Sequence, residues 1–333
     1  MAAQEDQDKL DAAKQALQAQ DYERALILCD VALADDPAHA DALYMAAVAA
    51  RYARRYDLAR DYVLRLRRAM PELGRGWQEA GHLARDTGDM AGAVTAYRRA
   101  VEYNPALSAS WTHQANLLAQ MGRQGEAQAA AAQAQRLAEL PRLLVAALNN
   151  IHEGRILLAE DQCRAFLQQN PHHVEGMRLL ADIGNRLGVV DDAEFLLESA
   201  VGFEPDNIQL RLDYIDVLRK RQKFVAAEEQ AQHLYDLQPD NILFQSHLAI
   251  ESMQTGQYEK ALTLFDRILE RMPEDVRTLT SRGHALKTYG KQAEAIESYR
   301  TAIAVRPEQG DAYYALANLK TFRFERSEEH TSE

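Results

Sequence analysis

Small and apolar residues recur at helical spacing in the stretch from 74 to 107, "GRGWQEAGHLARDTGDMAGAVTAYRRAVEYNPAL". The first set is Trp77, Ala80, Gly81 and Ala84, and the second is Ala93, Tyr97 and Ala100. Between them "DTGD" interrupts the helical pattern, and "NP" follows the second set. The pattern predicts two helices joined by a short turn.

Prolines divide the chain into units of nearly constant length. Six of the eight gaps between consecutive prolines are 34 residues. The prolines are Pro37, Pro71, Pro105, Pro141, Pro171, Pro205, Pro239, Pro273 and Pro307. A fixed period of this size indicates a solenoid, because one such unit cannot bury its own apolar face. Each proline except Pro141 is expected to end a helix, since it disfavours helical geometry in the residue before it.

Two further positions are nearly invariant when the proline is placed at position 32 of each repeat. Position 20 is always alanine: Ala25, Ala59, Ala93, Ala127, Ala159, Ala193, Ala227, Ala261 and Ala295. Position 8 is small except at Ile215: Ala13, Ala47, Gly81, Ala115, Ala147, Ala181, Ala249 and Gly283. Small residues at both positions allow the two helices of a repeat to approach within about 8 to 10 Å.

The pattern resembles the tetratricopeptide repeat, whose 34-residue helix-turn-helix period it matches. The residues that carry the resemblance are Trp77, Gly81, Ala93, Tyr97 and Pro105, then Trp111 and Ala127. It implies an all-α solenoid, a right-handed superhelix of antiparallel helix pairs. The nine expected repeats are 6–39, 40–73, 74–107, 108–139, 140–173, 174–207, 208–241, 242–275 and 276–309, after a polar tail at 1–5. Residues 310–325 are expected to form the first helix of a tenth repeat and the start of a linker.

The fourth repeat is irregular. It is two residues short, lacks its terminal proline, and carries "QAAAAQAQ" in its second helix. Pro141 is expected in the first turn of the following helix, where proline is tolerated. Two interpretations stand: the junction changes the local superhelical twist, or a short loop absorbs a plain deletion.

Composition and motifs give no sign of catalysis. Motifs for phosphate binding, serine hydrolysis and zinc proteolysis are all missing. Cys29 and Cys163 both occupy position 24, an inward site, and are interpreted as core residues without a disulfide between them. We expect no metal site and no cofactor in this chain.

Charge and hydropathy favour a cytoplasmic protein that binds neither nucleic acid nor membrane. The net charge is -12, whereas nucleic-acid binding needs a basic face. The beginning "MAAQEDQDKL" lacks a basic and then apolar leader, and no stretch approaches eighteen apolar residues.

Two local features have alternative interpretations. His172 and His173 follow Pro171 and are expected to be solvated turn residues rather than metal ligands, since no third ligand has suitable spacing. Seven arginines lie close together in this acidic chain: Arg51, Arg54, Arg55, Arg60, Arg65, Arg67 and Arg68. They are expected to form a solvated face, the alternative being a dock for an anionic partner.

The resemblance implies a peptide or partner protein bound in the concave groove, which positions 2, 5, 9 and 12 line. Carried over, these positions give Arg75, Gln78, His82, Arg85, Thr112, Asn116, Arg178, Asp182, Asn185, Asp216, Arg219, Arg277, His284, Lys287 and Asn318. In the fifth repeat they are the apolar Leu144, Leu148 and Ile151. Asn116 and Asn318 resemble the asparagines that hold a peptide backbone in some such arrays, since an amide both donates and accepts. The carboxylate clamp of chaperone-binding members is not recognisable.

Near the end, "DAYYALANLKTFRF" resembles the segment that joins tetratricopeptide repeats to a sulfotransferase domain in bacterial proteins. The resemblance implies a parent enzyme that transfers sulfate from 3′-phosphoadenosine-5′-phosphosulfate (PAPS), held by an anion-binding loop. No such loop occurs in these 333 residues, so this chain is expected to lack that activity.

The last eight residues, "RSEEHTSE" at 326–333, fit nothing before them. They can be encoded by a common sequencing-library adapter, so we expect a non-native tail, with a genuine polar tail as the alternative. Before it, Tyr313, Leu316 and Leu319, followed by Phe322 and Phe324, are expected to leave an exposed apolar end that favours self-association.

Three functions are therefore compatible with the sequence. The first is an interaction module that forms the front part of a repeat-containing sulfotransferase. The second is a free-standing adaptor for complex assembly, and the third is the front part of a repeat-containing O-glycosyltransferase, which the segment "LANLKTFRF" disfavours.

Overall fold

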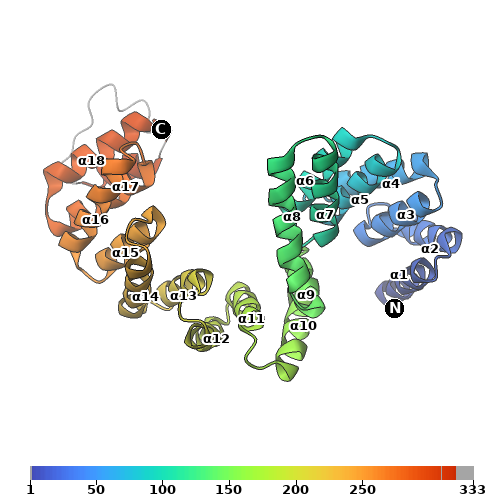
Figure 1. Cartoon of the computed structure of the whole chain (residues 1–333), viewed down its shortest axis with the longest axis horizontal. Helices are drawn as coiled ribbons and strands as arrows, with labels where there is room; N and C mark the ends of the chain where they lie inside the picture. Colours follow the sequence, from blue (N-terminus) through green and yellow to red (C-terminus); the bar gives the residue numbers. More distant parts are fainter. Residues whose placement is uncertain (1, 309, 320–333) are drawn as a thin grey trace. The chain divides into compact units, whose positions relative to one another are not determined.

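The computed structural model describes residues 2–308 and 310–319, with side chains described from residue 8 onward. Over this part of the chain it contains 19 α-helices and no strand. The helices divide between two compact units, residues 1–169 and 170–333 (Figure 1). The all-helical solenoid predicted from the proline period is thus confirmed.

The N-terminal unit contains the first five helix pairs. Their bounds are α1 Ala2–Gln18, α2 Tyr22–Asp35, α3 Ala40–Tyr52, α4 Tyr56–Ala69, α5 Gly74–Asp86, α6 Met90–Tyr103, α7 Ser108–Gln120, α8 Gln124–Glu139, α9 Arg142–His152 and α10 Ile156–Gln169.

The C-terminal unit continues the same alternation. Its helices are α11 Val174–Leu187, α12 Val190–Phe203, α13 Ile208–Lys220, α14 Phe224–Leu237, α15 Ile242–Gln254, α16 Tyr258–Arg271, α17 Val276–Tyr289, α18 Gln292–Val305 and α19 Gly310–Ala317.

Within each unit the two helices of a repeat lie side by side, and odd-numbered helices also contact one another (Figure 1). Such contacts join α1 to α3, α3 to α5, α11 to α13, and α15 to α17. The odd-numbered helices of a unit therefore line one face, which we call its inner face. The first helix of each repeat faces this side, as expected for a solenoid of helix pairs.

The invariant small residues lie where the paired helices touch. All nine position-20 alanines are buried, with at most 6% of their surface exposed. A Cβ added to Gly81 would lie 2.6 Å from the ring of Tyr97, and Gly283 is equally crowded by Tyr299. Ile215, the bulky exception, belongs to the repeat that has Ala231 at the Tyr97 position. In this repeat a bulky residue at position 8 therefore accompanies a small one at position 24.

A recurrent hydrogen bond joins several of the proline turns to the next repeat. The indole Nε1 of Trp77 donates to the carbonyl of Pro71 at 2.7 Å, and Trp111 donates to Pro105 at 2.8 Å. Gln245 donates to Pro239 in the same way. The proline ends one helix while its carbonyl oxygen accepts a bond from the next, which fixes the spacing between repeats.

The fourth repeat departs from this pattern. Helix α8 has 16 residues where the other second helices have 14, and Pro141 is the N-cap of α9 rather than part of its first turn. Asn149 of α9 donates to Val145 and Ala106 and accepts from Asn104. These bonds join the fifth repeat to the turn between the third and fourth, which favours a changed chain path over a plain deletion.

The same junction corrects one expectation. Leu144 and Ile151 were expected to line a groove, but their exposed fractions are 0% and 4%. They belong to the buried core, although Ala147 and Ala159 of the same repeat are buried like their equivalents elsewhere.

The cysteines and histidines behave as expected of structural residues. Cys29 and Cys163 are fully buried and not joined in a disulfide, and burial raises the pKa of Cys29 to about 12. His173 caps α11 by accepting from the amide of Gly176, and the ring of His172 lies against Phe203. Among the described residues there is no cluster suited to a metal ion, nor a helix long and apolar enough to cross a bilayer.

Three apolar residues of the tenth repeat that were expected to be exposed are buried. Helix α19 ends at Ala317. Tyr313, Leu316 and Leu319 are 8%, 0% and 3% exposed, so the expectation of an exposed apolar end at these residues was wrong. Helix α19 contacts α17 and α18, and these three side chains are buried. Phe322, Phe324 and the last eight residues lie outside the described part of the chain.

Candidate functional site

The inner face of the N-terminal unit contains a pocket of about 280 Å³. We call it the α1–α3 pocket. It is lined by Leu10, Asp11, Lys14 and Leu17 of α1, Asp41, Tyr44 and Met45 of α3, Arg75 of α5, and Arg155 from the turn before α10. It combines leucine, methionine and tyrosine walls with three cationic side chains, the composition expected of a site with an apolar anchor and oriented polar groups.

Charges in the α1–α3 pocket are unevenly paired. Asp41 accepts hydrogen bonds from both Arg75 and Arg155, and Glu153 forms weaker ion pairs with the same two arginines. Burial opposes it, but the two arginines lower the pKa of Asp41. Lys14 has no acidic partner among the described residues. The pocket therefore offers one cation, Lys14, that forms no ion pair within the described part of the chain, although Asp11 also lines the pocket.

Tyr44 forms part of the apolar wall and is positioned by a cation. The guanidinium carbon of Arg75 lies 4.8 Å from the centre of the Tyr44 ring. Burial, followed by the nearby charge of Glu79, raises the pKa of Tyr44 to about 12, so the hydroxyl remains a neutral donor at physiological pH.

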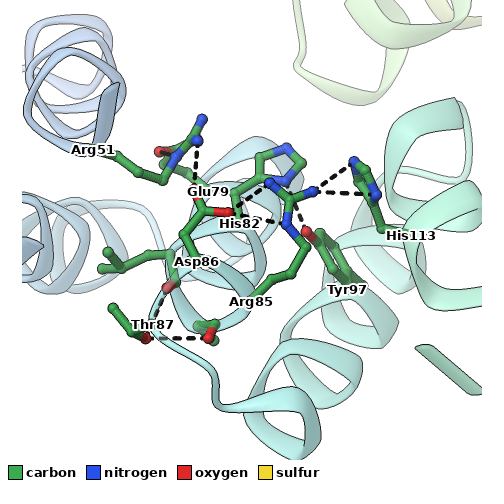
Figure 2. Close-up of polar contacts among 10 residues, drawn as sticks. Arg51, Glu79, His82, Arg85, Asp86, Thr87, Tyr97 and His113 are labelled. Atoms are coloured by element: carbon green, nitrogen blue, oxygen red, sulfur yellow. Dashed lines mark hydrogen bonds and ion pairs between the residues drawn. The ribbon is translucent and has the colours of Figure 1, made fainter. Parts of the chain in front are cut away.

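A second polar group, which we call the arginine–histidine cluster, lies along α5 and its neighbours (Figure 2). Arg51 of α3 donates to Glu79 at 2.5 Å and to Asp86 at 2.9 Å. Arg51 and Glu79 are only 7% and 2% exposed. Such a buried pair needs both partners, because removal of one leaves an uncompensated charge.

The other half of the arginine–histidine cluster is aromatic. His82 and the hydroxyl of Tyr97 are joined by a 2.7 Å hydrogen bond, and Arg85 lies 3.0 Å from Nε2 of His113 while it also donates to Asp86 (Figure 2). Burial and the positive charge of Arg51 lower the pKa of His82 to about 3. His82 is therefore a neutral hydrogen-bonding group at physiological pH and not a cation.

The C-terminal unit has an inner-face pocket of a different kind, about 300 Å³ in volume, between α11 and α13. We call it the α11–α13 pocket. Arg178 donates to Glu175 and, at 3.0 Å, to Asp213. Arg186 donates to Asp182 at 2.9 Å, and Lys220 donates to Asn185. Four of the expected groove residues, Arg178, Asp182, Asn185 and Asp216, line this pocket.

The expected groove residues thus fall into separate groups. Arg75 lies in the α1–α3 pocket, His82 and Arg85 lie in the arginine–histidine cluster, and Arg219 pairs with Asp216 and with the fully buried Glu251. His284 and Tyr299 form a 2.9 Å hydrogen bond like that of His82 and Tyr97.

The remaining expected residues are not gathered into a pocket. Thr112 donates to its own helix at Ser108, and Gln78 and Lys287 are half-buried. Asn116, Arg277 and Asn318 are exposed, on α7, on α17 and directly after α19.

The structure also adds residues that were not named from the sequence as groove residues. Lys14, Asp41, Tyr44 and Arg51 occupy positions 9, 2, 5 and 12 of the first two repeats. The register rule used for the later repeats would have found all four. Arg155 lies in a turn outside those positions, and only the changed path of the fifth repeat brings it to Asp41.

Comparisons with protein families identify the repeat in two places. A TPR-repeat model matches residues 283–320, and a tetratricopeptide-repeat model matches residues 74–107.

Individual relatives are distant. The chain is 23% identical over 171 residues to human Protein O-mannosyl-transferase TMTC1, a match that spans 50% of this chain and 19% of that protein. The chain thus spans less than a fifth of that relative's length.

Solved structures similar to parts of the chain include MamA and YrrB. The crystal structure of MamA is 18% identical with a TM-score of 0.45, over 49% of this chain and 95% of MamA. YrrB, described as a TPR protein with an unusual peptide-binding site, is 16% identical with a TM-score of 0.45, over 67% of this chain and 98% of YrrB.

Proposed function

For this scaffold of tetratricopeptide repeats, we propose that the inner face of the N-terminal unit binds a peptide segment of a partner protein, with its anchor in the α1–α3 pocket. The observation that carries the proposal is the composition of that pocket. It has an apolar wall to receive a side chain and, beside it, a cation, Lys14, that forms no ion pair within the described part of the chain.

The chemistry of the pocket specifies the ligand. Leu10, Leu17 and Tyr44 suit an aliphatic or aromatic side chain, whose burial stabilises a complex by about 25 cal/mol per Å² of apolar area. Lys14 suits a carboxylate one or two residues away in the peptide. We therefore propose a short motif that places an apolar residue beside Asp or Glu.

A random peptide library selected against the full-length chain tests this proposal. We expect the selected sequences to share an apolar–acidic motif. Titration calorimetry with a synthetic selected peptide should show at least a tenfold loss of affinity, about 1.4 kcal/mol, for Tyr44→Ala.

Lys14→Glu should weaken the same peptide by reversing the charge without disturbing the core. The matched control is Arg186→Glu in the α11–α13 pocket, which should change affinity less than twofold. Equal affinities for all of these variants, or selected peptides without an acidic residue, would contradict the proposal.

The parent protein is a separate question, and we propose that it is a repeat-containing sulfotransferase that uses PAPS. The segment "LANLKTFRF" supports this parent, because it resembles the segment that precedes the sulfotransferase domain in such proteins. Its residues beyond 319 lie outside the described part of the chain. The distant similarity to TMTC1 supports the alternative, an O-glycosyltransferase parent, and an adaptor without an enzyme domain is the third possibility.

Sequencing of the gene beyond the Phe324 codon discriminates between these parents. A phosphosulfate-binding loop supports the sulfotransferase, a nucleotide-sugar domain the glycosyltransferase, and an early stop codon the adaptor. Eight natural codons for "RSEEHTSE" would contradict our expectation that the tail is non-native.

A further inference from the structure

Three arginines of the segment 51–68 form no ion pair among the described residues, namely Arg54, Arg67 and Arg68, and of these only Arg67 is partly buried. Arg51, Arg55, Arg60 and Arg65 each form an ion pair with a carboxylate of the chain. Arg67 forms no ion pair and no hydrogen bond among the described residues. The solvated face expected from the sequence therefore does not describe Arg67, whose surroundings are unlike those of its neighbours.

Stacking on an indole ring holds the Arg67 guanidinium in place. Its central carbon lies 3.5 Å from the centre of the Trp77 ring, and Trp77 is itself fixed by its bond to Pro71. The Nε of Arg67 is buried and has no acceptor, and burial lowers the pKa of Arg67 without any acidic group to oppose it. Arginine remains charged in proteins, so this is a preorganised and incompletely solvated cation.

A pocket of about 260 Å³ lies beside this cation, between α4 and α5. Val63, Leu64 and Leu83 supply apolar walls, and Arg60, Thr87 and Asp89 supply polar atoms. The Asp89 carboxylate is engaged as the N-cap of α6, where it accepts from the amide of Gly92. None of these residues occupies positions 2, 5, 9 or 12 of its repeat, so the pocket is distinct from the inner-face sites.

We propose that this α4–α5 pocket is a second peptide site, which takes an acidic side chain on the Arg67 guanidinium and an adjacent apolar side chain against Val63, Leu64 and Leu83. A planar guanidinium with free Nη groups can bind a carboxylate through two parallel hydrogen bonds. A peptide fits better than a nucleic acid, because binding of a phosphate backbone needs several unpaired cations and the chain carries a net charge of -12.

Fluorescence of Trp77 reports directly on this pocket. The chain has two tryptophans, so Trp111→Phe leaves Trp77 as the only one. The probe is an acetylated and amidated peptide of alternating Leu and Glu, and the same peptide with Gln in place of Glu is the uncharged control. We expect a saturable change in Trp77 emission with the acidic peptide, and at least tenfold weaker binding of the Gln peptide.

Two substitutions in the pocket and one outside it test the assignment. Arg67→Gln should weaken binding of the acidic peptide at least tenfold, and Arg67→Lys should weaken it less because the charge remains. Arg60→Gln, at an exposed residue that does not hold the fold together, should weaken it about threefold. Arg68→Gln, the adjacent exposed arginine, should leave binding unchanged. Circular dichroism of each variant verifies that it is folded.

Some outcomes would overturn the proposal. These are equal binding of the Glu and Gln peptides, an Arg60→Gln variant that binds as tightly as the parent, or a larger loss from Arg68→Gln than from Arg67→Gln. A single-stranded oligonucleotide that displaces the peptide would equally overturn it. Because Tyr44→Ala affects only the α1–α3 pocket, failure of this site and failure of the proposed inner-face function are distinguishable.

Discussion

The α1–α3 pocket and the α11–α13 pocket occupy equivalent inner-face positions of the two units, yet their chemistry differs. In the α11–α13 pocket, Arg178 and Arg186 each donate to a carboxylate of their own unit. In the α1–α3 pocket, Lys14 has no acidic partner and lies beside an apolar wall. Charged residues at groove positions therefore indicate binding only where the chain leaves them unpaired, since a paired charge must first lose its partner.

The two units also share a Gly–His–Tyr arrangement. Gly81, His82 and Tyr97 have the counterparts Gly283, His284 and Tyr299, with the same histidine–tyrosine hydrogen bond. Burial lowers the pKa of both histidines; in the N-terminal copy the positive charge of Arg51 adds to burial, and the pKa of His82 falls to about 3. Both tryptophans of the chain lie in the N-terminal unit, so their fluorescence measures unfolding of that unit within the full-length protein.

The largest loss of folding stability should come from Arg51→Met in the N-terminal unit. It leaves Glu79 buried without a counter-charge, which costs about 3 to 5 kcal/mol. Urea unfolding followed by tryptophan fluorescence measures the loss. The double variant Arg51→Met with Glu79→Met should recover most of the stability, because both charges are gone. A single variant within 1 kcal/mol of the parent would show that the pair is not buried in solution.

Arg219→Met is the matched change in the C-terminal unit, where it leaves the fully buried Glu251 unpaired. It should lower the overall helical unfolding transition measured by circular dichroism. The tryptophan-detected transition of the N-terminal unit should move much less. Equal shifts in both signals would mean that the two units unfold as one.

Gly81→Ala should lower the free energy of unfolding by about 2 to 3 kcal/mol, because the added methyl group overlaps the Tyr97 ring. The double variant Gly81→Ala with Tyr97→Leu reproduces the pair Ala181 and Leu197 of the sixth repeat, and should regain part of the loss. A double-mutant cycle from denaturant unfolding measures the coupling. Additive losses would show that the two positions do not pack together.

Protonation of His82 should lower the stability of the N-terminal unit by about 1 to 2 kcal/mol in acid, and His284 should not affect that unit. His82 has a folded pKa near 3, below its unfolded value of about 6.5, so the unfolded state binds the proton first as pH falls. Its contribution to stability is complete above pH 6.5 and is lost progressively toward pH 3. Tryptophan-detected unfolding at pH 7 and 4.5 should therefore show a weaker acid destabilisation in His82→Gln. His284→Gln is the control, and an equal change there would refute the assignment.

The smallest effect is expected for Arg186→Gln, at most about 0.5 kcal/mol. Arg186 and Asp182 are a solvent-exposed pair four residues apart on one helix. Thermal unfolding followed by circular dichroism measures it. A loss above 1 kcal/mol would mean that the charge pairing of the α11–α13 pocket contributes more than its exposure suggests.

The sequence predicted the fold well because the same residue types recur at the same positions from repeat to repeat. Ala193 and its equivalents are buried at the helix contact, and Pro105 and its equivalents end second helices. The site was harder to predict. The pairing of Arg178 with Asp213 and of Asp41 with Arg155 depends on distances between repeats, which no local pattern encodes. Leu144 was misassigned because it is buried in the core, whereas residues at the same position of other repeats, such as Thr112, are exposed.

Methyl-labelled NMR of methionine in the full-length chain tests the central claim most directly, that the α1–α3 pocket is the peptide site. Met45 lines that pocket, whereas Met177 lies on α11 of the C-terminal unit. Met45→Leu and Met177→Leu assign the two signals. On addition of a selected apolar–acidic peptide, we expect the Met45 signal to shift to saturation and the Met177 signal to stay in place. A shift of Met177 with Met45 unchanged would contradict the account.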